Sequence, residues 1–209
     1  MTAHSFSLSH QELPLTQFAG DTTQFMTPSW EDLTTMSFQI AQELLARHQP
    51  IDRIVTLAKG GWPMTRSLVD FLRVSAVASI GVKFYADINE RLKVPQVYQE
   101  LPVSVQGERV LLFDDVADTG ESLQYTREYL LQAGVAEVVT ATLFYKPHSI
   151  VKPDVFGTET KAWIIFPYEL VEASLLLRKK WQAQGITDEE IMQRFVQLGF
   201  RIDWVQLYL

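Results

Sequence analysis

The sequence predicts an α/β domain with a mostly parallel, twisted sheet that is flanked by helices. Short apolar runs alternate with helical segments between residues 53 and 145, which is the pattern of repeated strand–helix–strand units. Of the 209 residues, 47% are hydrophobic and 21% are charged, so the chain is long and apolar enough for one domain with its own core.

Periodicity places the individual elements. Ser29, followed by Asp32 three residues later, predicts a capped helix start, and apolar residues at helical spacing carry that helix to about His48, before Pro50. The next elements, in chain order, are a strand at 53–58, a helix at 63–73, a strand at 76–85, a polar surface loop at 86–100, a strand at 110–114, a helix at 122–133 and a strand at 137–145.

The two ends of the chain have a different character. Residues 1–27 show no clear periodicity and predict an extended or loosely ordered arm. After residue 145 we expect one or two strands in 154–166, helices at 168–182 and 188–198 (the second capped by Thr187), and a terminal strand at 203–209. These features divide the chain into an N-terminal arm (1–28), a domain (29–170) and a C-terminal extension packed on it (171–209).

Charge and composition exclude several classes of partner. The formal charge of −7 makes nucleic acid or an anionic membrane an unsuitable partner, so any anionic ligand must be held by local geometry. The chain has no cysteine, which excludes disulfides and thiol chemistry. We also expect no signal peptide and no transmembrane helix, and therefore a cytoplasmic protein.

The stretch Val110–Ser122 carries the most chemistry. An apolar run ends in Asp114 and Asp115, and Asp118-Thr119-Gly120 then leads into a helix. A small-residue loop at a helix N-terminus can hold a phosphate, and the carboxylates beside it suit the hydroxyls or the metal ion of a phosphorylated sugar. Because successive strand residues point to opposite faces, the two adjacent acids should differ in role, one of them meeting ligand or metal and the other being structural.

A second loop, Lys59-Gly60-Gly61, occupies an equivalent place after the strand at 53–58. By itself it is typical of a tight strand-to-helix turn. Lys59, however, directly follows a buried strand and is well placed to meet an anion at the sheet edge. Two such loops on neighbouring strands would hold two anionic groups of one ligand.

Val110–Ser122 resembles the phosphoribosyl-pyrophosphate signature of type I phosphoribosyltransferases: an apolar strand, two acids, two mostly apolar residues, Asp-Thr-Gly, a variable residue, and Thr or Ser. Leu57–Gly61 resembles the pyrophosphate loop of that family, and residues 86–100 fall where the family carries its mobile catalytic loop. Residues 144–147 and 162–169 resemble the purine pocket of the xanthine and guanine enzymes. The resemblance covers roughly residues 30–170 and implies the family fold, with a small hood.

The resemblance implies transfer of the phosphoribosyl group from phosphoribosyl pyrophosphate to a 6-oxopurine base, with Mg²⁺ as cofactor. The sugar and its 5-phosphate would be bound by Asp114, Asp115, Ala117, Asp118, Thr119, Gly120, Glu121 and Ser122. Asp114 and Asp115 would face the ribose hydroxyls, directly or through Mg²⁺ and water. Lys59, Gly60 and Gly61 would hold the pyrophosphate. Asp118 matches the acid that faces N7 of the purine and is the candidate general base.

Four residues would read the base: Lys146, Trp163, Ile164 and Glu169. The ammonium of Lys146 only donates hydrogen bonds, so it favours a 6-oxo over a 6-amino group, although a lysine at a strand end is more commonly a solvated side chain. Trp163 could stack on the base, although a tryptophan in an apolar run is more commonly a core residue.

Two regions depart from the family pattern. Glu121 stands where many relatives have glycine or lysine, and residues 86–100 contain no recognisable motif. The four histidines, His4, His10, His48 and His148, form no ligand-spaced pair and are interpreted as surface residues.

Two alternatives to this enzyme remain open. The first is a regulatory module on the same fold that senses phosphoribosyl pyrophosphate or a nucleotide, and the second is a phosphoribosyltransferase for another nucleobase. A homodimer is expected from the resemblance only, with Trp204, Val205, Leu207 and Leu209 requiring burial against the domain or a second subunit.

Overall fold

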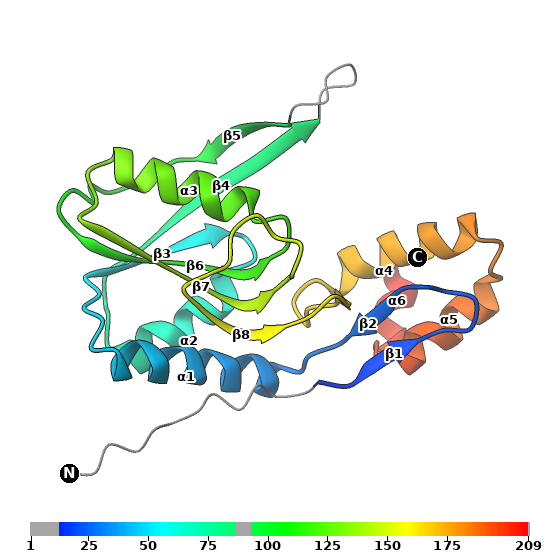
Figure 1. Cartoon of the computed structure of the whole chain (residues 1–209). Coiled ribbons are helices and arrows are strands. Elements are labelled where there is room, and N and C mark those ends of the chain that lie inside the picture. Colours follow the sequence, from blue (N-terminus) through cyan, green and yellow to red (C-terminus); the bar gives the residue numbers. More distant parts are fainter. Residues whose placement is uncertain (1–12, 87–92, 209) are drawn as a thin grey trace, which may run out of the picture. The chain divides into compact units, whose positions relative to one another are not determined.

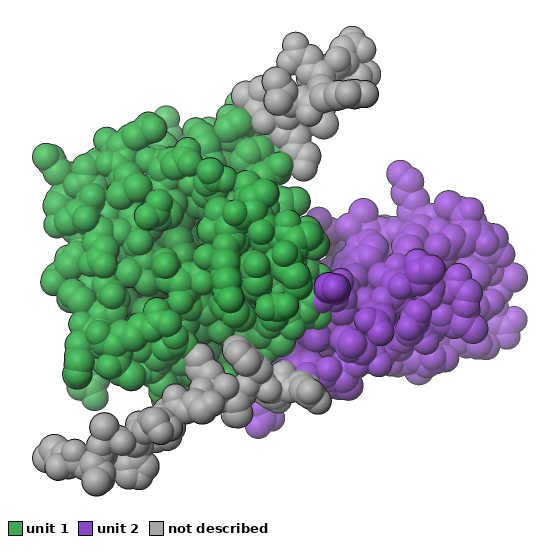
Figure 2. Space-filling view, in the orientation of Figure 1, with its two compact units in different colours: residues 1–11, 33–160 green, residues 12–32, 161–209 purple. Residues whose placement is uncertain are grey.

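The structure is a computed structural model and describes residues 13–86 and 93–208. These residues form two compact units, one of residues 33–160 and the other of residues 13–32 with 161–208 (Figure 2). In unit 2, the segment before the first long helix pairs with chain that follows residue 160. The predicted segments 1–28, 29–170 and 171–209 stay a prediction. The part of the predicted arm at 1–12 lies outside the described residues.

Unit 1, residues 33–160, is built on a six-stranded sheet in the order β5-β4-β3-β6-β7-β8 (Figure 1). The strands are β3 (Arg53–Ala58), β4 (Val77–Ala86), β5 (Lys93–Gln99), β6 (Arg109–Ala117), β7 (Glu137–Tyr145) and β8 (Val155–Glu159). All neighbours pair in parallel except β4 and β5. The predicted α/β class with a mostly parallel sheet is confirmed.

Helices lie on both faces of this sheet: α1 (Trp30–Ala46) and α2 (Trp62–Leu72) on one, and α3 (Glu121–Gln132) on the other (Figure 1). Double coverage explains why the central strands read as continuous apolar runs, as in Val110–Phe113, which is buried throughout. The predicted cap of α1 is present: the Ser29 amide donates to Asp32 Oδ2 at 2.8 Å, and the Asp32 amide donates to Ser29 Oγ at 3.1 Å.

Unit 2 contains a three-stranded sheet, β1-β2-β9, and three helices. Its elements are β1 (Leu15–Gln17), β2 (Gln24–Met26), β9 (Trp163–Ile164), α4 (Leu170–Ala183), α5 (Asp188–Gln197) and α6 (Ile202–Tyr208). Phe25, Leu177, Trp181 and Phe195 form the centre of its core, each fully buried. The predicted cap of α5 is present, with Thr187 Oγ1 accepting from the Glu190 amide.

A buried carboxylate ties the two parts of unit 2 together. Asp21 is 5% exposed and accepts hydrogen bonds from Trp181 Nε1 (3.2 Å) and Lys180 Nζ (3.2 Å). Burial raises the pKa of Asp21, but hydrogen bonds from Thr23, Trp181 and Lys180 outweigh burial and lower the pKa to about 2. The carboxylate is therefore ionised at neutral pH and anchors the segment before β2 to α4.

Three predicted elements are wrong. Residues 93–99 of the expected loop form edge strand β5, antiparallel to β4, while residues 87–92 lie outside the described residues. In place of the expected strand at 203–209, α6 occupies Ile202–Tyr208 and buries Val205. The described part of the N-terminal arm holds strands β1 and β2, which are too short for periodicity to reveal. None of the helices in the described ranges is long and apolar enough to cross a membrane.

Candidate active site

The strand order of unit 1 creates a switch point between β3 and β6. After β3 the chain moves outward to β4 and β5, and it then returns to place β6 on the other side of β3. The register pairs Thr56 with Phe113, so the carboxyl ends of both strands reach the same edge of the sheet. Ligands of open α/β sheets bind in the crevice at such a point.

The first predicted loop, Lys59-Gly60-Gly61, lies at the end of β3. The Ala58–Lys59 peptide bond is cis, and Gly61 caps the N-terminus of α2 with φ −71°. A Cβ on Gly61 would lie 2.4 Å from Thr56 Oγ1 and 2.9 Å from the Phe113 carbonyl oxygen. Glycine is required here because the loop passes close to the backbone of β6.

The first loop meets strand β6 where Gly60 approaches Asp115. A Cβ on Gly60 would lie 2.5 Å from each carboxylate oxygen of Asp115, so only the absence of a side chain lets this acid approach the first loop. Asp115 is 6% exposed, whereas Asp114 is more accessible and accepts from the Asp115 amide at 2.9 Å. The first loop therefore lies against the strand that leads to the second loop, and the adjacent acids differ in accessibility. The binding of one ligand by both loops, and the separate roles of the two acids, stay predictions.

The second predicted loop carries Asp118, Thr119 and Gly120 to the start of α3. Gly120 has φ +81° and is the N-cap residue of α3, with no side chain capping the helix. Asp118 and Thr119 are exposed, and Glu121 and Ser122 are partly buried in the first turn. The first turn of a helix leaves backbone N–H groups without intrahelical acceptors, so this end of α3 has the geometry of an anion site.

Lys146 lies at the end of β7, beside the second loop. Its amide donates to the Ala117 carbonyl at 3.0 Å, and the residue is 7% exposed, so the structure does not support the alternative of a solvated lysine. Burial lowers the pKa of Lys146 from its usual 10.5, and the negative charge of Asp118 opposes this shift. A cationic donor and a carboxylate thus face the same edge of the sheet.

His148 adds a contact that the sequence interpretation missed. Its Nε2 lies 3.0 Å from Asp118 Oδ1, with both side chains 62% exposed. His148 is a surface residue, as expected, but it pairs with an acid from the neighbouring strand. The available signal was its position two residues after Lys146, at the sheet edge that also receives Asp118.

The remaining residues predicted to read the base, Trp163, Ile164 and Glu169, belong to unit 2 and are described there alone. Trp163 is partly buried and packs against the core of unit 2, with Lys180 Nζ 5.6 Å from its ring centre. Ile164 is buried, and Glu169 stands at the N-cap of α4 without a capping side-chain bond. Their part in base recognition stays a prediction.

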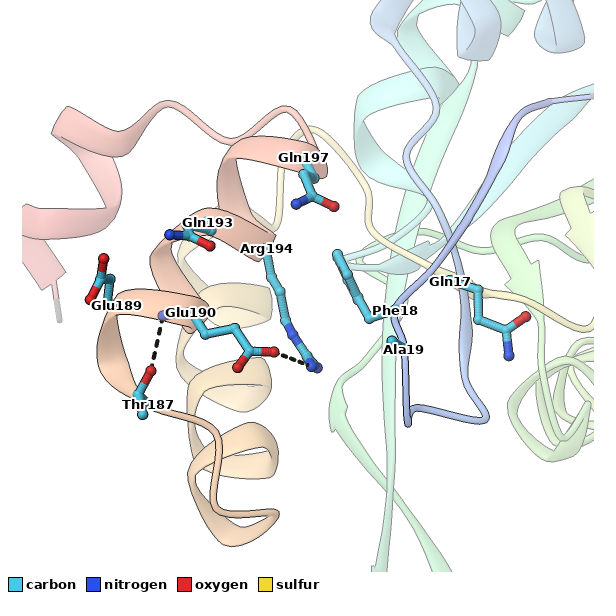
Figure 3. A pocket seen from close by; sticks show the side chains of 9 residues that line it. All are labelled: Gln17, Phe18, Ala19, Thr187, Glu189, Glu190, Gln193, Arg194 and Gln197. Atoms are coloured by element: carbon cyan, nitrogen blue, oxygen red, sulfur yellow. Dashed lines mark hydrogen bonds and ion pairs between the residues drawn. The ribbon is translucent and has the colours of Figure 1, made fainter.

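A hollow of about 460 Å³ also lies in unit 2 (Figure 3). Thr187 and residues of α5 form one side and residues 17–19 the other, and Arg194 bonds Glu190 within it at 2.7 Å. None of the predicted site residues lines this hollow. We therefore do not assign the reaction to it, although it is large enough to hold a small molecule.

The residues that could hold a metal ion are Asp114 and Asp115. Their hard carboxylate oxygens suit Mg²⁺. Within residues 13–86 and 93–208, no group of three or more acidic or histidine side chains could hold a metal ion. At phosphate sites Mg²⁺ commonly takes ligands from one or two carboxylates, from substrate phosphates and from water.

Comparisons with known proteins agree with this geometry. Residues 28–173 match the family described as phosphoribosyl transferase domain. The xanthine-guanine phosphoribosyltransferase of Gluconobacter oxydans is 27% identical over 150 residues, 71% of this chain and 86% of that protein. The enzyme of the same name from Nitratidesulfovibrio vulgaris is 29% identical over 143 residues, 68% of this chain and 82% of that protein.

A solved structure extends the agreement to three dimensions. The purine phosphoribosyltransferase of Pyrococcus horikoshii superposes with a TM-score of 0.63 at 30% identity, covering 69% of this chain and 93% of that one. A xanthine-guanine-hypoxanthine phosphoribosyltransferase of Helicobacter pylori, at 19% identity and a TM-score of 0.62, shares the fold. Because the family match spans both loops of the switch point and most of the chain, this protein belongs to the phosphoribosyltransferase family.

Proposed function

We propose that this protein transfers the 5-phosphoribosyl group from phosphoribosyl pyrophosphate to a 6-oxopurine base, giving a nucleotide and pyrophosphate for purine salvage. The observation that carries the proposal is the close approach of Gly60, in the first loop, to the carboxylate of Asp115, in the strand that leads to the second loop. One substrate with phosphate groups at both ends of a sugar would occupy both loops, and the relatives named above include enzymes for xanthine and guanine.

Within this proposal, the sugar and its 5-phosphate occupy the second loop. Backbone N–H groups of residues 117–122 and the hydroxyls of Thr119 and Ser122 hold the phosphate. The more accessible Asp114 and the buried Asp115 face the ribose hydroxyls. Lys59, Gly60 and Gly61 bind the pyrophosphate, whose departure from the anomeric carbon leaves a transition state with oxocarbenium character.

Mg²⁺ fits the carboxylates of Asp114 and Asp115, and when bound it would offset the negative charge of the pyrophosphate. The residues of the chain position the two substrates and accept the proton that is released. Asp118 takes the proton that the purine loses as its ring nitrogen bonds to the anomeric carbon. Lys146 donates to the 6-oxo group, while Trp163, Ile164 and Glu169 complete base recognition.

A turnover assay tests the proposal. The protein is incubated with phosphoribosyl pyrophosphate, Mg²⁺ and a panel of xanthine, guanine, hypoxanthine, adenine and uracil, and pyrophosphate release is followed. We expect turnover with a 6-oxopurine and little with adenine. Tight binding of phosphoribosyl pyrophosphate without turnover on any base would favour the regulatory alternative, and turnover on uracil alone would favour another nucleobase.

The role of Lys146 has its own test. Replacing Lys146 with Gln supplies an amide that both donates and accepts, so the preference for hypoxanthine over adenine should fall by about 10- to 100-fold. The ratio of kcat/KM for the two bases measures this preference. An unchanged ratio would remove Lys146 from base recognition.

We also infer a homodimer, for which the exposed apolar side chains of α6 give support. Val205 is buried within unit 2, but Trp204 and Leu207 are 50% and 77% exposed. Leu209 lies outside the described residues. Light scattering would measure the mass, and a monomer at micromolar concentration would contradict the inference.

A further inference from the structure

The segment that follows β7 is fastened to the second loop by two backbone hydrogen bonds. The Lys146 amide donates to the Ala117 carbonyl at 3.0 Å, and the Ile150 amide donates to the Thr119 carbonyl at 2.9 Å. These bonds flank Asp118 in the loop and His148 in the segment. Position 148 is therefore held opposite position 118 by the backbone, independently of either side chain.

The turn between these two bonds is also fixed. The Ser149 amide donates to the Lys146 carbonyl at 2.9 Å, and Ser149 Oγ accepts from the Val151 amide. A Cβ on Gly120 would lie 2.3 Å from Ser149 Oγ, so the turn rests directly on the second loop. The imidazole of His148 thus extends from a well-defined turn to within 3.0 Å of Asp118 Oδ1.

The chemistry of the pair determines the direction of its hydrogen bond. An ionised carboxylate only accepts, so His148 Nε2 carries the hydrogen and donates to Oδ1. This bond fixes the plane of the Asp118 carboxylate and leaves Oδ2 to accept a proton. A carboxylate that is otherwise exposed rotates among several orientations, only some of which face the base.

We infer that His148 is a positioning residue, which orients the Asp118 carboxylate for proton abstraction from the purine. The inference rests on the proposed function, because it requires Asp118 to be the general base. It assigns His148 no contact with phosphoribosyl pyrophosphate. Loss of His148 should therefore lower kcat and leave binding of that substrate unchanged.

Two variants at position 148 test the inference. His148→Ala should lower kcat about tenfold or more, the value of a hydrogen bond to a charged group, and change the Kd for phosphoribosyl pyrophosphate by less than about twofold. His148→Gln, which keeps a donor of similar reach, should recover most of the loss. Ile150→Ala, in the same turn and at an exposed side chain that cannot donate a hydrogen bond, serves as the control.

A double-mutant cycle separates positioning from an independent contact. If His148 acts through Asp118, then His148→Ala in an Asp118→Asn background should cost less than about twofold in kcat, measured with radiolabelled base. The full loss persisting in that background would overturn the inference, as would an equal rise in the Kd for phosphoribosyl pyrophosphate or no recovery in His148→Gln. Unchanged kcat in His148→Ala overturns this inference alone, whereas an inactive unmodified protein overturns it together with the proposed function.

Discussion

The two glycine loops at the switch point each lead from a strand into a helix, but their backbone conformations differ. Gly61 caps α2 with φ −71°, a conformation open to any residue, and glycine is needed there because Thr56 and Phe113 leave no room for a Cβ. Gly120 caps α3 with φ +81°, which itself favours glycine, and it also rests against Ser149 and Val151.

This contrast separates two reasons for a glycine at a phosphate loop. In the first loop the glycines let the loop approach its neighbours, most of all where Gly60 meets the carboxylate of Asp115. In the second loop glycine lets the chain turn before a helix. Replacing Gly60 in the first loop should therefore disturb ligand binding, whereas replacing Gly120 in the second should disturb folding.

The largest expected effect concerns the carboxylate of Asp118 in the second loop, which has no counterpart in the first loop. Asp118→Asn removes the proposed base and should lower kcat by about 10²- to 10⁴-fold, while the Kd for phosphoribosyl pyrophosphate changes little. Steady-state kinetics and calorimetry give the two values. Equal losses in kcat and affinity would show that Asp118 serves binding, the role proposed for the first loop.

Gly60→Ala probes the first loop. The new methyl group meets the end of the Asp115 side chain, which moves more easily than backbone, so displacement of the carboxylate should relieve the clash. We expect the Kd for phosphoribosyl pyrophosphate to rise by about tenfold or more, since a misdirected carboxylate loses a hydrogen bond. Gly107→Ala, remote from both loops, is the control. An unchanged Kd for phosphoribosyl pyrophosphate in Gly60→Ala would contradict the proposed contact between Asp115 and this substrate.

Gly120→Ala probes the second loop through stability. A left-handed conformation costs alanine about 1–2 kcal/mol, and the clash with the Val151 backbone nitrogen at 2.9 Å adds about 1–3 kcal/mol. Gly107 has φ +76°, and a Cβ added there would meet nothing within 4 Å, so Gly107→Ala isolates the first cost. Urea unfolding of both variants measures the difference, and equal losses would show that crowding at Gly120 is negligible.

The smallest effect concerns the pH dependence contributed by Lys146 beside the second loop. Its pKa is lower in the folded protein than its usual 10.5, so the unfolded chain binds more protons and this residue makes stability rise with pH between the two values. Compared with Lys146→Met, the unmodified protein should gain stability as the pH rises toward 10.5. A difference in unfolding free energy that stays constant with pH would contradict the burial of the ammonium.

The strands that carry the site could be predicted because their signal is local. The run at 53–58 became β3 with the same bounds, and the run at 137–145 became β7. Both are buried on two faces, so each reads as a continuous apolar segment whatever its neighbours are. The run predicted at 110–114 is longer in the structure, where β6 spans Arg109–Ala117 and includes Asp114 and Asp115. The ligand contacts of the loops that follow β3 and β6 stay predictions.

Elements whose conformation depends on distant partners could not be predicted in this way. The β-rich composition of 203–209 favours a strand, yet packing against α4 and α5 makes it a helix. Pro95 and the polar residues of 93–99 are as compatible with a loop as with the edge strand that they form. The pairing of His148 with Asp118 joins residues 30 positions apart, and only the register of β6 and β7 brings them together.

The buried carboxylate of Asp21 has a consequence for biosynthesis. Its partner Lys180 follows 159 residues later, so the segment around Asp21 leaves the ribosome long before α4 exists. At about 5–20 residues per second, that interval is about 8–32 s. All of the chain of unit 1 has been synthesised within this interval, whereas unit 2 must wait for its C-terminal helices. Its early strands, β1 and β2, are therefore exposed to chaperones and proteases while their partners are still being made.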